Sequence, residues 1–157
     1  MQPIVSTTTY RVTYADTDQM GVVYYGNYGR LLEIGRTEMI RELGMPYSDL
    51  EKSGIVMPVY SVESRYRNVL KYDELVTIET TVKEVPMARI TFHYRIFNEA
   101  GVLAHEAKAV LVFLDIKTNR PVRAPALLLN VLKKHWGLLK VSKVISGLIP
   151  ILPGNPV

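Results

Sequence analysis

The chain has 157 residues, the length of one domain of about 150 residues, and its composition of 48% hydrophobic and 22% charged residues excludes a disordered chain. It contains no cysteine, which excludes disulfides, thiolate metal sites and a cysteine nucleophile. Nineteen Lys and Arg residues against 15 Asp and Glu residues give a net charge of +4. Because no basic stripe concentrates this charge, nucleic acid is not an expected partner.

Metal binding and membrane insertion are not expected either. The three histidines, His93, His105 and His135, lie far apart in the sequence and none has the spacing of metal ligands. The N-terminal residues lack the basic start and apolar core of a signal peptide. No apolar run approaches the roughly 18 residues that cross a bilayer. We therefore expect a soluble, cytoplasmic protein without a metal site.

The N-terminal part of the chain predicts a strand, a turn-rich loop and a long helix. Polar and apolar residues alternate over residues 7–14, which is typical of a strand. The segment 15–21 is rich in turn-forming residues, and a helical apolar stripe follows over residues 27–43 with Asn27 as its N-cap. Gly35 interrupts this stripe at a cost of about 1 kcal/mol against alanine, which predicts a close approach of another element.

The remainder of the chain is mostly strand. After a predicted loop over residues 47–53, the period-2 or continuous apolar signature predicts four strands, at 55–67, 75–85, 88–97 and 102–115. A shorter helix is predicted within residues 121–136, starting near Pro125. This order predicts an α+β domain in which an antiparallel sheet wraps around one long central helix.

Apolar residues on both faces of the last predicted strand suggest a homo-oligomer. Val110, Val112 and Leu114 alternate with Leu111 and Phe113. The central helix can cover only one face of the sheet, so a second copy of the chain is expected to cover the other. We expect a dimer or a dimer of dimers.

Two aspartates directly before the long helix are the clearest candidates for chemistry. Asp16 and Asp18 flank Thr17 in the turn-rich loop, and a lone pair of this kind is more often structural than catalytic. Here Tyr25 follows Asp18 by seven residues, at the start of a helix whose first backbone N–H groups are free. A carboxylate beside such amides provides both halves of an acyl-transfer site, because the amides can hold an oxyanion.

The motif around this loop resembles the active-site segment of the hotdog-fold acyl-CoA thioesterases, of the 4-hydroxybenzoyl-CoA thioesterase type. The similarity is greatest to the bacterial branch associated with the Tol-Pal cell-envelope system. It is carried by residues 14–28 (YADTDQMGVVYYGNY), Glu33-x-x-Arg36, Tyr66-Arg67, Tyr72-Asp73 and residues 120–123 (RPVR). A segment of this length is far more specific than the two aspartates alone.

The resemblance implies a hotdog fold and hydrolysis of an acyl-CoA or acyl-carrier-protein thioester, with CoA as part of the substrate and no cofactor. It implies that Asp18 is the catalytic carboxylate and that the backbone amide of Tyr25, beside Gly26 and Asn27, polarises the thioester carbonyl. Asp16 matches a position that shapes the loop. Many members of the envelope branch carry histidine where this chain has Tyr25.

Other charged residues have weaker assignments. Arg65, Arg67, Lys71 and Arg89 are candidate ligands for CoA or phosphopantetheine phosphates, although charges on strand faces are usually only solvated. Some hotdog thioesterases carry their carboxylate on the central helix, where this chain has Glu33. We favour an ion pair of Glu33 with Arg36 or Arg30, since Asp18 fills the catalytic role in the matching subfamily.

The family's domain accounts for residues 1–137 and leaves residues 138–157 as an extension of the same unit. Apolar residues in this extension fall at helical spacing, with two lysines nearby: Val141, Val144, Ile145, Leu148, Ile149 and Leu152, with Lys140 and Lys143. We favour packing of this stripe against the protein itself or a sister subunit. The alternative is contact with an anionic membrane surface.

The sequence is also compatible with two other functions. One is a non-catalytic acyl-CoA-binding protein with the same fold, which would normally lack the carboxylate or carry an added DNA-binding module. The other is a hotdog hydratase, which would need a histidine near the acid, whereas the first histidine of this chain is His93.

Overall fold

The fold was determined from a computed structural model, which describes residues 1–139. In chain order the elements are β1 (Ile4–Arg11), the 3-10 helices η1 (Tyr14–Asp16) and η2 (Tyr25–Asn27), α1 (Tyr28–Glu42), α2 (Tyr47–Lys52), β2 (Ile55–Val56), β3 (Val59–Tyr66), β4 (Leu75–Val82), β5 (Arg89–Phe97), β6 (Leu103–Val112), β7 (Leu114–Asp115), β8 (Arg120–Pro121) and α3 (Ala126–His135). The long predicted helix and the predicted strands are all present, so the α+β class is confirmed.

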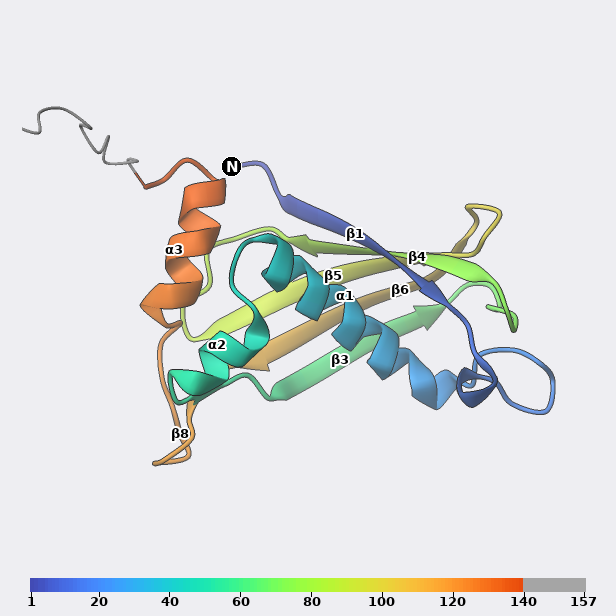
Figure 1. Ribbon diagram of the computed structural model, residues 1–157, viewed down its shortest axis with the longest axis horizontal. Coiled ribbons are helices and arrows are strands. Elements are labelled where there is room, and N and C mark those ends of the chain that lie inside the picture. Colours follow the sequence, from blue (N-terminus) through green and yellow to red (C-terminus); the bar gives the residue numbers. More distant parts are fainter. Residues whose placement is uncertain (140–157) are drawn as a thin grey trace, which may run out of the picture.

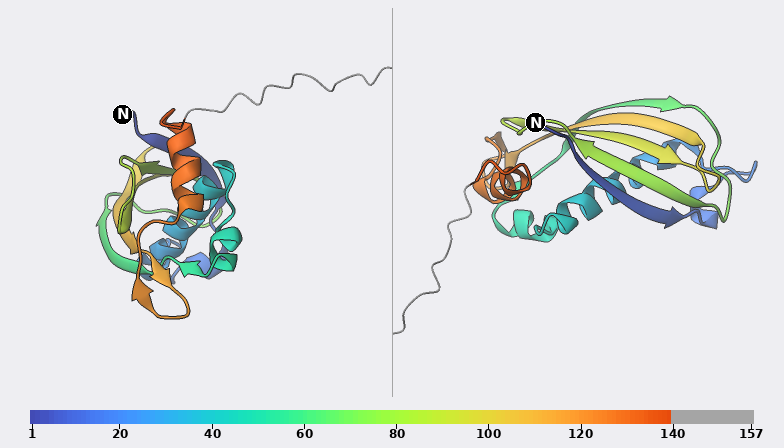
Figure 2. Two further views of the ribbon diagram at one scale, coloured as in Figure 1. Left: turned by 90° about the vertical axis from the view of Figure 1, so that its left-hand side faces the viewer. Right: turned by 90° about the horizontal axis from the view of Figure 1, so that it is seen from above.

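Five strands form one antiparallel sheet in the order β1-β4-β5-β6-β3. The sheet curves around α1, which lies along its concave face, while α3 closes the end of the molecule near the N-terminus (Figure 1). Two further views show the same wrapping from the end and from above (Figure 2). The beginning of α1 lies at the opposite end of the sheet from α3 (Figure 1).

The core forms between the concave face and α1 because both surfaces carry their apolar residues at the right period. Buried and less buried residues alternate along β4 and β5, as expected for strands with one covered face. On α1 the predicted stripe is buried: Tyr28, Leu31, Leu32, Gly35 and Met39, joined by Ile40.

Gly35 is the point of closest approach between α1 and the sheet. A Cβ atom at this position would lie 2.5 Å from Thr80 Oγ1 and 2.8 Å from Ile78 Cγ2 on β4. Real Cβ atoms do not come so close to other heavy atoms, so only glycine allows this helix–sheet distance. The close approach predicted from the glycine in the apolar stripe is confirmed.

Several predicted boundaries differ from the structure. The predicted loop at 47–53 contains the short helix α2, and the predicted strand at 55–67 divides into β2 and β3 around Pro58. Proline lacks the N–H group that a continuous strand would donate. The predicted strand at 102–115 likewise divides, and its last residues form β7 in a small sheet ordered β2-β7-β8. Strand β1 begins three residues earlier than predicted, at Ile4, and ends at Arg11.

The convex face of the large sheet is less apolar than the sequence suggested. Val110 and Val112 lie half-buried on it, and Leu114 belongs to the small sheet instead. Most of the other side chains on this face are polar: Thr77, Glu79, Thr81, Thr91, His93, Arg95, Glu106 and Lys108. The apolar residues expected on the second face are thus present at Val110 and Val112, while Leu114 lies elsewhere and most of the face is polar.

The C-terminal helix is tied to the N-terminal strand. Trp136 Nε1 donates a hydrogen bond of 2.7 Å to the carbonyl of Gln2. Within residues 1–139, no helix combines the length and apolar character needed to cross a membrane. The apolar stripe predicted between Val141 and Leu152 lies outside the described residues.

Candidate active site

The loop between η1 and η2 doubles back on itself and places its two arms side by side. The amide of Asp18 donates to the carbonyl of Val22 at 3.0 Å, and the amide of Tyr24 donates to the carbonyl of Asp16 at 2.9 Å. Thr17 and Val23 form an antiparallel bridge between these contacts. The arm that carries Asp18 therefore lies against the arm that leads to the start of α1.

Asp16 is a buried carboxylate whose oxygens are all engaged. Its Oδ2 accepts hydrogen bonds from the Thr13 amide (2.7 Å), the Thr13 hydroxyl (2.8 Å) and the Tyr10 hydroxyl (2.8 Å). Its Oδ1 accepts from Arg30 of α1. Burial alone would raise the pKa of this carboxyl, but the hydrogen bonds from Thr13, Tyr10 and Arg30 outweigh it and lower the pKa. These contacts join β1, η1 and α1 at one residue.

Asp18 lies in a different environment, half-buried at the turn of the loop. Its Oδ1 accepts a hydrogen bond of 2.8 Å from the amide of Met20. In the described part of the chain no ion pair and no other side-chain hydrogen bond holds this carboxylate. Asp18 is thus the aspartate of the pair that remains available to a ligand or to water.

Free backbone amides lie on the second arm. Tyr25 and Gly26 begin η2, and across residues 1–139 neither amide donates to another group. The helical segments η2 and α1 follow without interruption, so these N–H groups form the positive end of a helix. Asn27 was predicted to cap the helix with its side chain, but its Nδ2 donates instead to the carbonyl of Asp16 at 2.9 Å.

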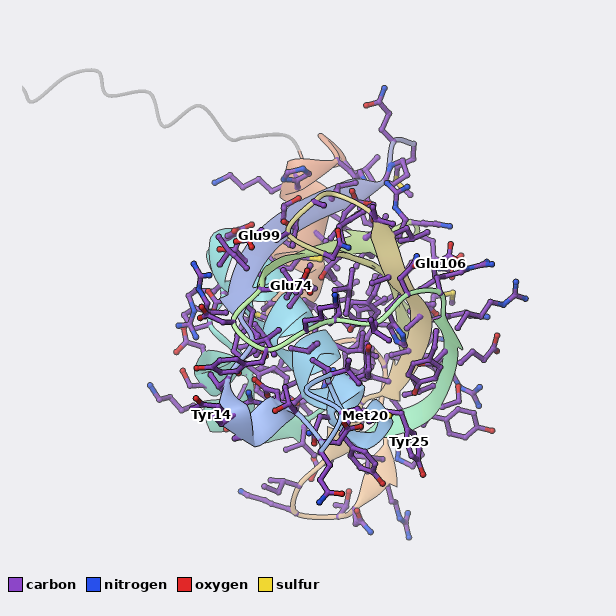
Figure 3. The ribbon with its side chains drawn as sticks, turned by 90° about the vertical axis from the view of Figure 1, so that its right-hand side faces the viewer. Tyr14, Met20, Tyr25, Glu74, Glu99 and Glu106 are labelled. Atoms are coloured by element: carbon purple, nitrogen blue, oxygen red, sulfur yellow. The ribbon has the colours of Figure 1, made fainter. Side chains whose placement is uncertain are left out.

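A pocket of about 300 Å³ opens beside these amides. Its walls come from the loop, η2, α1, the last residue of β3 and the segment that follows it: Val23, Tyr25, Tyr28, Tyr66, Arg67, Asn68 and Val69. Tyr28 and Tyr66 meet edge to face with 5.0 Å between their ring centroids. Tyr14, Met20 and Tyr25 are largely exposed around the same end of the molecule (Figure 3).

A buried histidine supports this aromatic wall. His105 of β6 is 0% exposed, and its ring centroid lies 4.3 Å from that of Tyr28 and 4.7 Å from that of Tyr66. Its Nε2 lies 3.2 Å from Ser64 Oγ, while its Nδ1 has no hydrogen-bond partner in the part of the molecule described. Burial lowers the pKa of His105 to about 4, so the ring is neutral at neutral pH.

The predicted basic residues are divided between several places. Arg67 lines the aromatic pocket and pairs with Glu106 at 2.7 Å, whereas Arg65 lies on the convex face of the sheet. Lys71 forms an isolated backbone β-bridge with Val22, in the loop that carries Asp18. Arg89 begins β5 at the far end of the sheet, where its guanidinium lies 4.3 Å from the Tyr60 ring centroid. The structure therefore separates Arg89 from the other predicted ligands within one protomer.

The expected pairing of Glu33 with Arg36 or Arg30 is wrong. Arg30 is drawn to the buried carboxylate of Asp16, where the lower exposure strengthens the attraction. Glu33 is exposed and forms no ion pair among the described residues. The roles of Tyr10 and Arg30 around Asp16 were missed, although Arg30 lies one helical turn after Asn27 and faces the same loop. Within residues 1–139, no three His, Asp or Glu side chains group to hold a metal ion.

Comparison with known proteins adds independent information. The family model of the thioesterase-like superfamily matches residues 12–132. YneP of Bacillus subtilis, described as a candidate acyl-CoA thioesterase, is 36% identical over 119 residues, covering 76% of this chain and 86% of that protein. The acyl-CoA thioesterase YbgC of Haemophilus influenzae is 34% identical, covering 73% and 85%. A DHNA-CoA thioesterase structure from Staphylococcus aureus superposes with a TM-score of 0.80 at 34% identity, covering 85% and 92%.

Proposed function

The chain belongs to the thioesterase-like superfamily and has its hotdog fold, and we propose that it hydrolyses acyl-CoA thioesters to the free acid and CoA. One observation carries the proposal. The unbonded amides of Tyr25 and Gly26 and the available carboxylate of Asp18 lie on two adjoining arms of one loop. These are the two groups that acyl transfer requires.

In the proposed reaction the Tyr25 amide donates a hydrogen bond to the thioester oxygen, which becomes negative as the carbonyl carbon is attacked. The positive end of the helix adds to this stabilisation. Asp18 then acts in one of two ways. Its carboxylate attacks the carbon, forming a mixed anhydride that water hydrolyses, or it accepts a proton from the attacking water. In both routes the carbon–sulfur bond breaks and CoA leaves as its thiol.

The finer substrate assignment is also part of the proposal. We propose an aromatic acyl group, as in the 4-hydroxybenzoyl-CoA thioesterase type, because the pocket beside Tyr25 is walled by the rings of Tyr28 and Tyr66. Aromatic rings favour edge-to-face and offset contacts with such walls. The Tol-Pal-associated branch remains a prediction from the motif, with Tyr25 in place of the histidine common there. An acyl-carrier-protein thioester is the alternative substrate.

We propose that the protein forms a homodimer, or a dimer of dimers, through strand β3. This strand is an edge of the large sheet, so one side of its backbone is free to pair with a second copy. Its apolar side chains are unusually exposed: Val59, Tyr60, Val62 and Tyr66 are 48–61% accessible. A partner on this edge would also cover the aromatic pocket, since Tyr66 belongs to both.

Cofactor, nucleic acid and metal play no part in the proposed reaction, and Gly26 and Asn27 shape the loop that holds the substrate carbonyl. Arg67 and Lys71 are proposed to face the pantetheine or phosphate portion, since both lie beside the site. We propose that the protein acts in the cytoplasm, on intracellular CoA esters.

A thiol-release assay with a panel of aromatic and aliphatic acyl-CoA esters tests the function. The expected result is turnover of at least one ester, fastest with an aromatic acyl group. Tight binding without thiol release would instead support a non-catalytic acyl-CoA-binding protein. Hydration of an enoyl-CoA without thiol release would support a hydratase.

A further inference from the structure

A second depression lies on the convex face of the large sheet, on the side away from α1. Its volume is about 420 Å³, larger than that of the aromatic pocket. Side chains and backbone of β3, β5 and β6 and the end of β4 line it: Glu63, Ser64, Arg65, Arg67, Thr81, Lys83, His93, Tyr94, Arg95, Glu106, Ala107 and Lys108. Glu106 projects from this side of the sheet in Figure 3.

The depression is strongly cationic. Five of its lining residues are Lys or Arg and only two are Glu. Two of the five cations are paired: Arg67 with Glu106 of the lining at 2.7 Å, and Arg95 with Glu79, which lies outside the lining, at 2.8 Å. Charges on a solvated strand face are usually of both signs. Here positive charge predominates around a hollow on the convex face, which favours an anionic ligand.

Within the described residues, three of these cations have no carboxylate partner. Arg65, Lys83 and Lys108 form no ion pair with any described residue, although Glu63 stands opposite Lys108 in the strand register. The pKa of the nearby His93 is lowered, mainly by burial and further by the positive charges of Lys83 and Lys108. The charge of Glu84 has a smaller effect in the opposite direction.

The depression is continuous with the candidate active site through one residue. Arg67 lines both the aromatic pocket beside Tyr25 and the cationic depression. The amide of Arg67 donates to the carbonyl of Ala104 at 2.8 Å, so Arg67 lies level with the start of β6. Lys108 is four residues further along that strand, about 13 Å away at roughly 3.3 Å per residue.

We propose that this cationic depression binds the phosphates of CoA, with Lys83, Lys108 and Arg65 as the principal ligands. The inference rests on the proposed function, since it requires a CoA ester whose thioester lies beside Tyr25. The pantetheine arm would pass over Arg67, around the end of β3, to the convex face. CoA carries a diphosphate and a 3′-phosphate, and these anions match a hollow with three cations that form no ion pair among residues 1–139.

The test compares two substrates that share an acyl group and differ in the nucleotide. One is the acyl-CoA ester, and the other is the same acyl group on N-acetylcysteamine, which has no phosphate. In the double variant Lys83→Gln/Lys108→Gln, we expect the ratio of kcat/KM for the CoA ester over that for the short ester to fall at least about tenfold, through KM. The matched control Lys117→Gln/Lys133→Gln removes two lysines that do not line the depression and should keep the wild-type ratio.

An unchanged ratio in the Lys83→Gln/Lys108→Gln variant would overturn the inference while leaving the proposed function intact. A loss of assembly mass in this variant, measured by light scattering, would also overturn it and assign the face to a contact between subunits. If wild-type protein hydrolyses neither ester, the proposed function fails. The anion site is then tested by calorimetry, which measures the binding of adenosine 3′,5′-bisphosphate to the wild type and to the double variant. Wild-type binding that is weakened at least about tenfold in the double variant would support the anion site, and equal binding would refute it.

Discussion

Two aspartates separated by one residue have opposite environments in this protein. Asp16 is 2% exposed and accepts hydrogen bonds from three residues, whereas Asp18 is half-buried and, among residues 1–139, held only by the amide of Met20. A buried carboxylate whose two oxygens both accept hydrogen bonds from the protein stabilises the fold and is closed to a substrate. The environment thus separates a structural role from a chemical one within a single turn.

The first prediction concerns these two residues. Asp18→Asn keeps the size of the side chain and removes its charge, so the turnover number should fall by at least about a hundredfold with the melting temperature little changed. Asp16→Asn removes the negative charge and replaces one of the two accepting oxygens by an NH2 donor, so part of the hydrogen bonds from Tyr10, Thr13 and Arg30 is lost. The free energy of unfolding should fall by roughly 1–3 kcal/mol. Steady-state thiol release and urea unfolding measure both effects. A larger loss of turnover in Asp16→Asn than in Asp18→Asn, at equal folded fraction, would show that Asp16 and not Asp18 is the catalytic carboxylate.

The second prediction concerns His105, whose pKa in the folded protein is about 4 against 6.5 in the unfolded chain. Between these values the unfolded chain binds a proton that the folded protein does not. Stability should therefore be lost as the pH falls from about 6.5 to 4, by up to roughly 1 kcal/mol per pH unit. Urea unfolding at several pH values measures this slope.

The matched variants are His105→Phe, which keeps an aromatic ring against Tyr28 and Tyr66, and His135→Gln at the exposed end of α3. The slope between pH 6.5 and 4 should become shallower in His105→Phe and stay as in the wild type in His135→Gln. Equal slopes in all three proteins would show that His105 is not the buried neutral group described above.

At the scale of elements, the distance between α1 and the sheet is set by one glycine. The close contacts of Gly35 with Thr80 and Ile78 leave no room for a methyl group. The third prediction is that Gly35→Ala lowers the free energy of unfolding by about 1–3 kcal/mol, although alanine favours the helix. Gly29→Ala, on the same helix with no atom within 4 Å of the added methyl, should instead raise stability by up to about 1 kcal/mol. Thermal unfolding of the two variants measures both changes in stability. Changes of the same sign in the two variants would contradict the prediction.

At the scale of the whole molecule, the two edges of the sheet differ in what they expose. The fourth prediction is that Val62→Arg on the β3 edge reduces the assembly to a mass near the 17.8 kDa chain, because a charge there cannot be buried between subunits. Val5→Arg on the opposite edge, β1, should leave the mass unchanged, although Val5 is similarly exposed. Light scattering at micromolar concentration measures both, and a wild-type mass near 17.8 kDa would refute the proposed dimer.

The last prediction concerns the extension that follows α3. An apolar stripe such as that of residues 141–152 needs cover, and we expect it to pack on the protein itself or on a sister subunit. Truncation after Trp136 removes this packing and should therefore lower the melting temperature or the assembly mass. Neither form should bind anionic vesicles. If truncation leaves stability and mass unchanged but abolishes vesicle binding, the membrane-surface alternative is correct instead.

Local patterns in the sequence were sufficient for much of this architecture and for the loop of the candidate site. The helical stripe with Gly35 predicted α1 and its close approach, and strand alternation predicted β4 and β5, because both signals depend only on residues a few positions apart. The motif from residue 14 to 28 placed Asp18 before a helix start for the same reason. Boundaries failed where proline or an early turn interrupted a pattern, as at Pro58.

Only the tertiary structure decided which distant residues meet. The pairing of Arg30 with Asp16, the position of His105 beneath Tyr28 and the separation of Arg89 from the site depend on how α1 docks and how the strands are registered. The gathering of cations on the convex face has the same origin, because β4, β5, β6 and β3 bring them together from four parts of the chain. Register and docking are set by packing across the whole sheet, and no short segment of sequence contains that information.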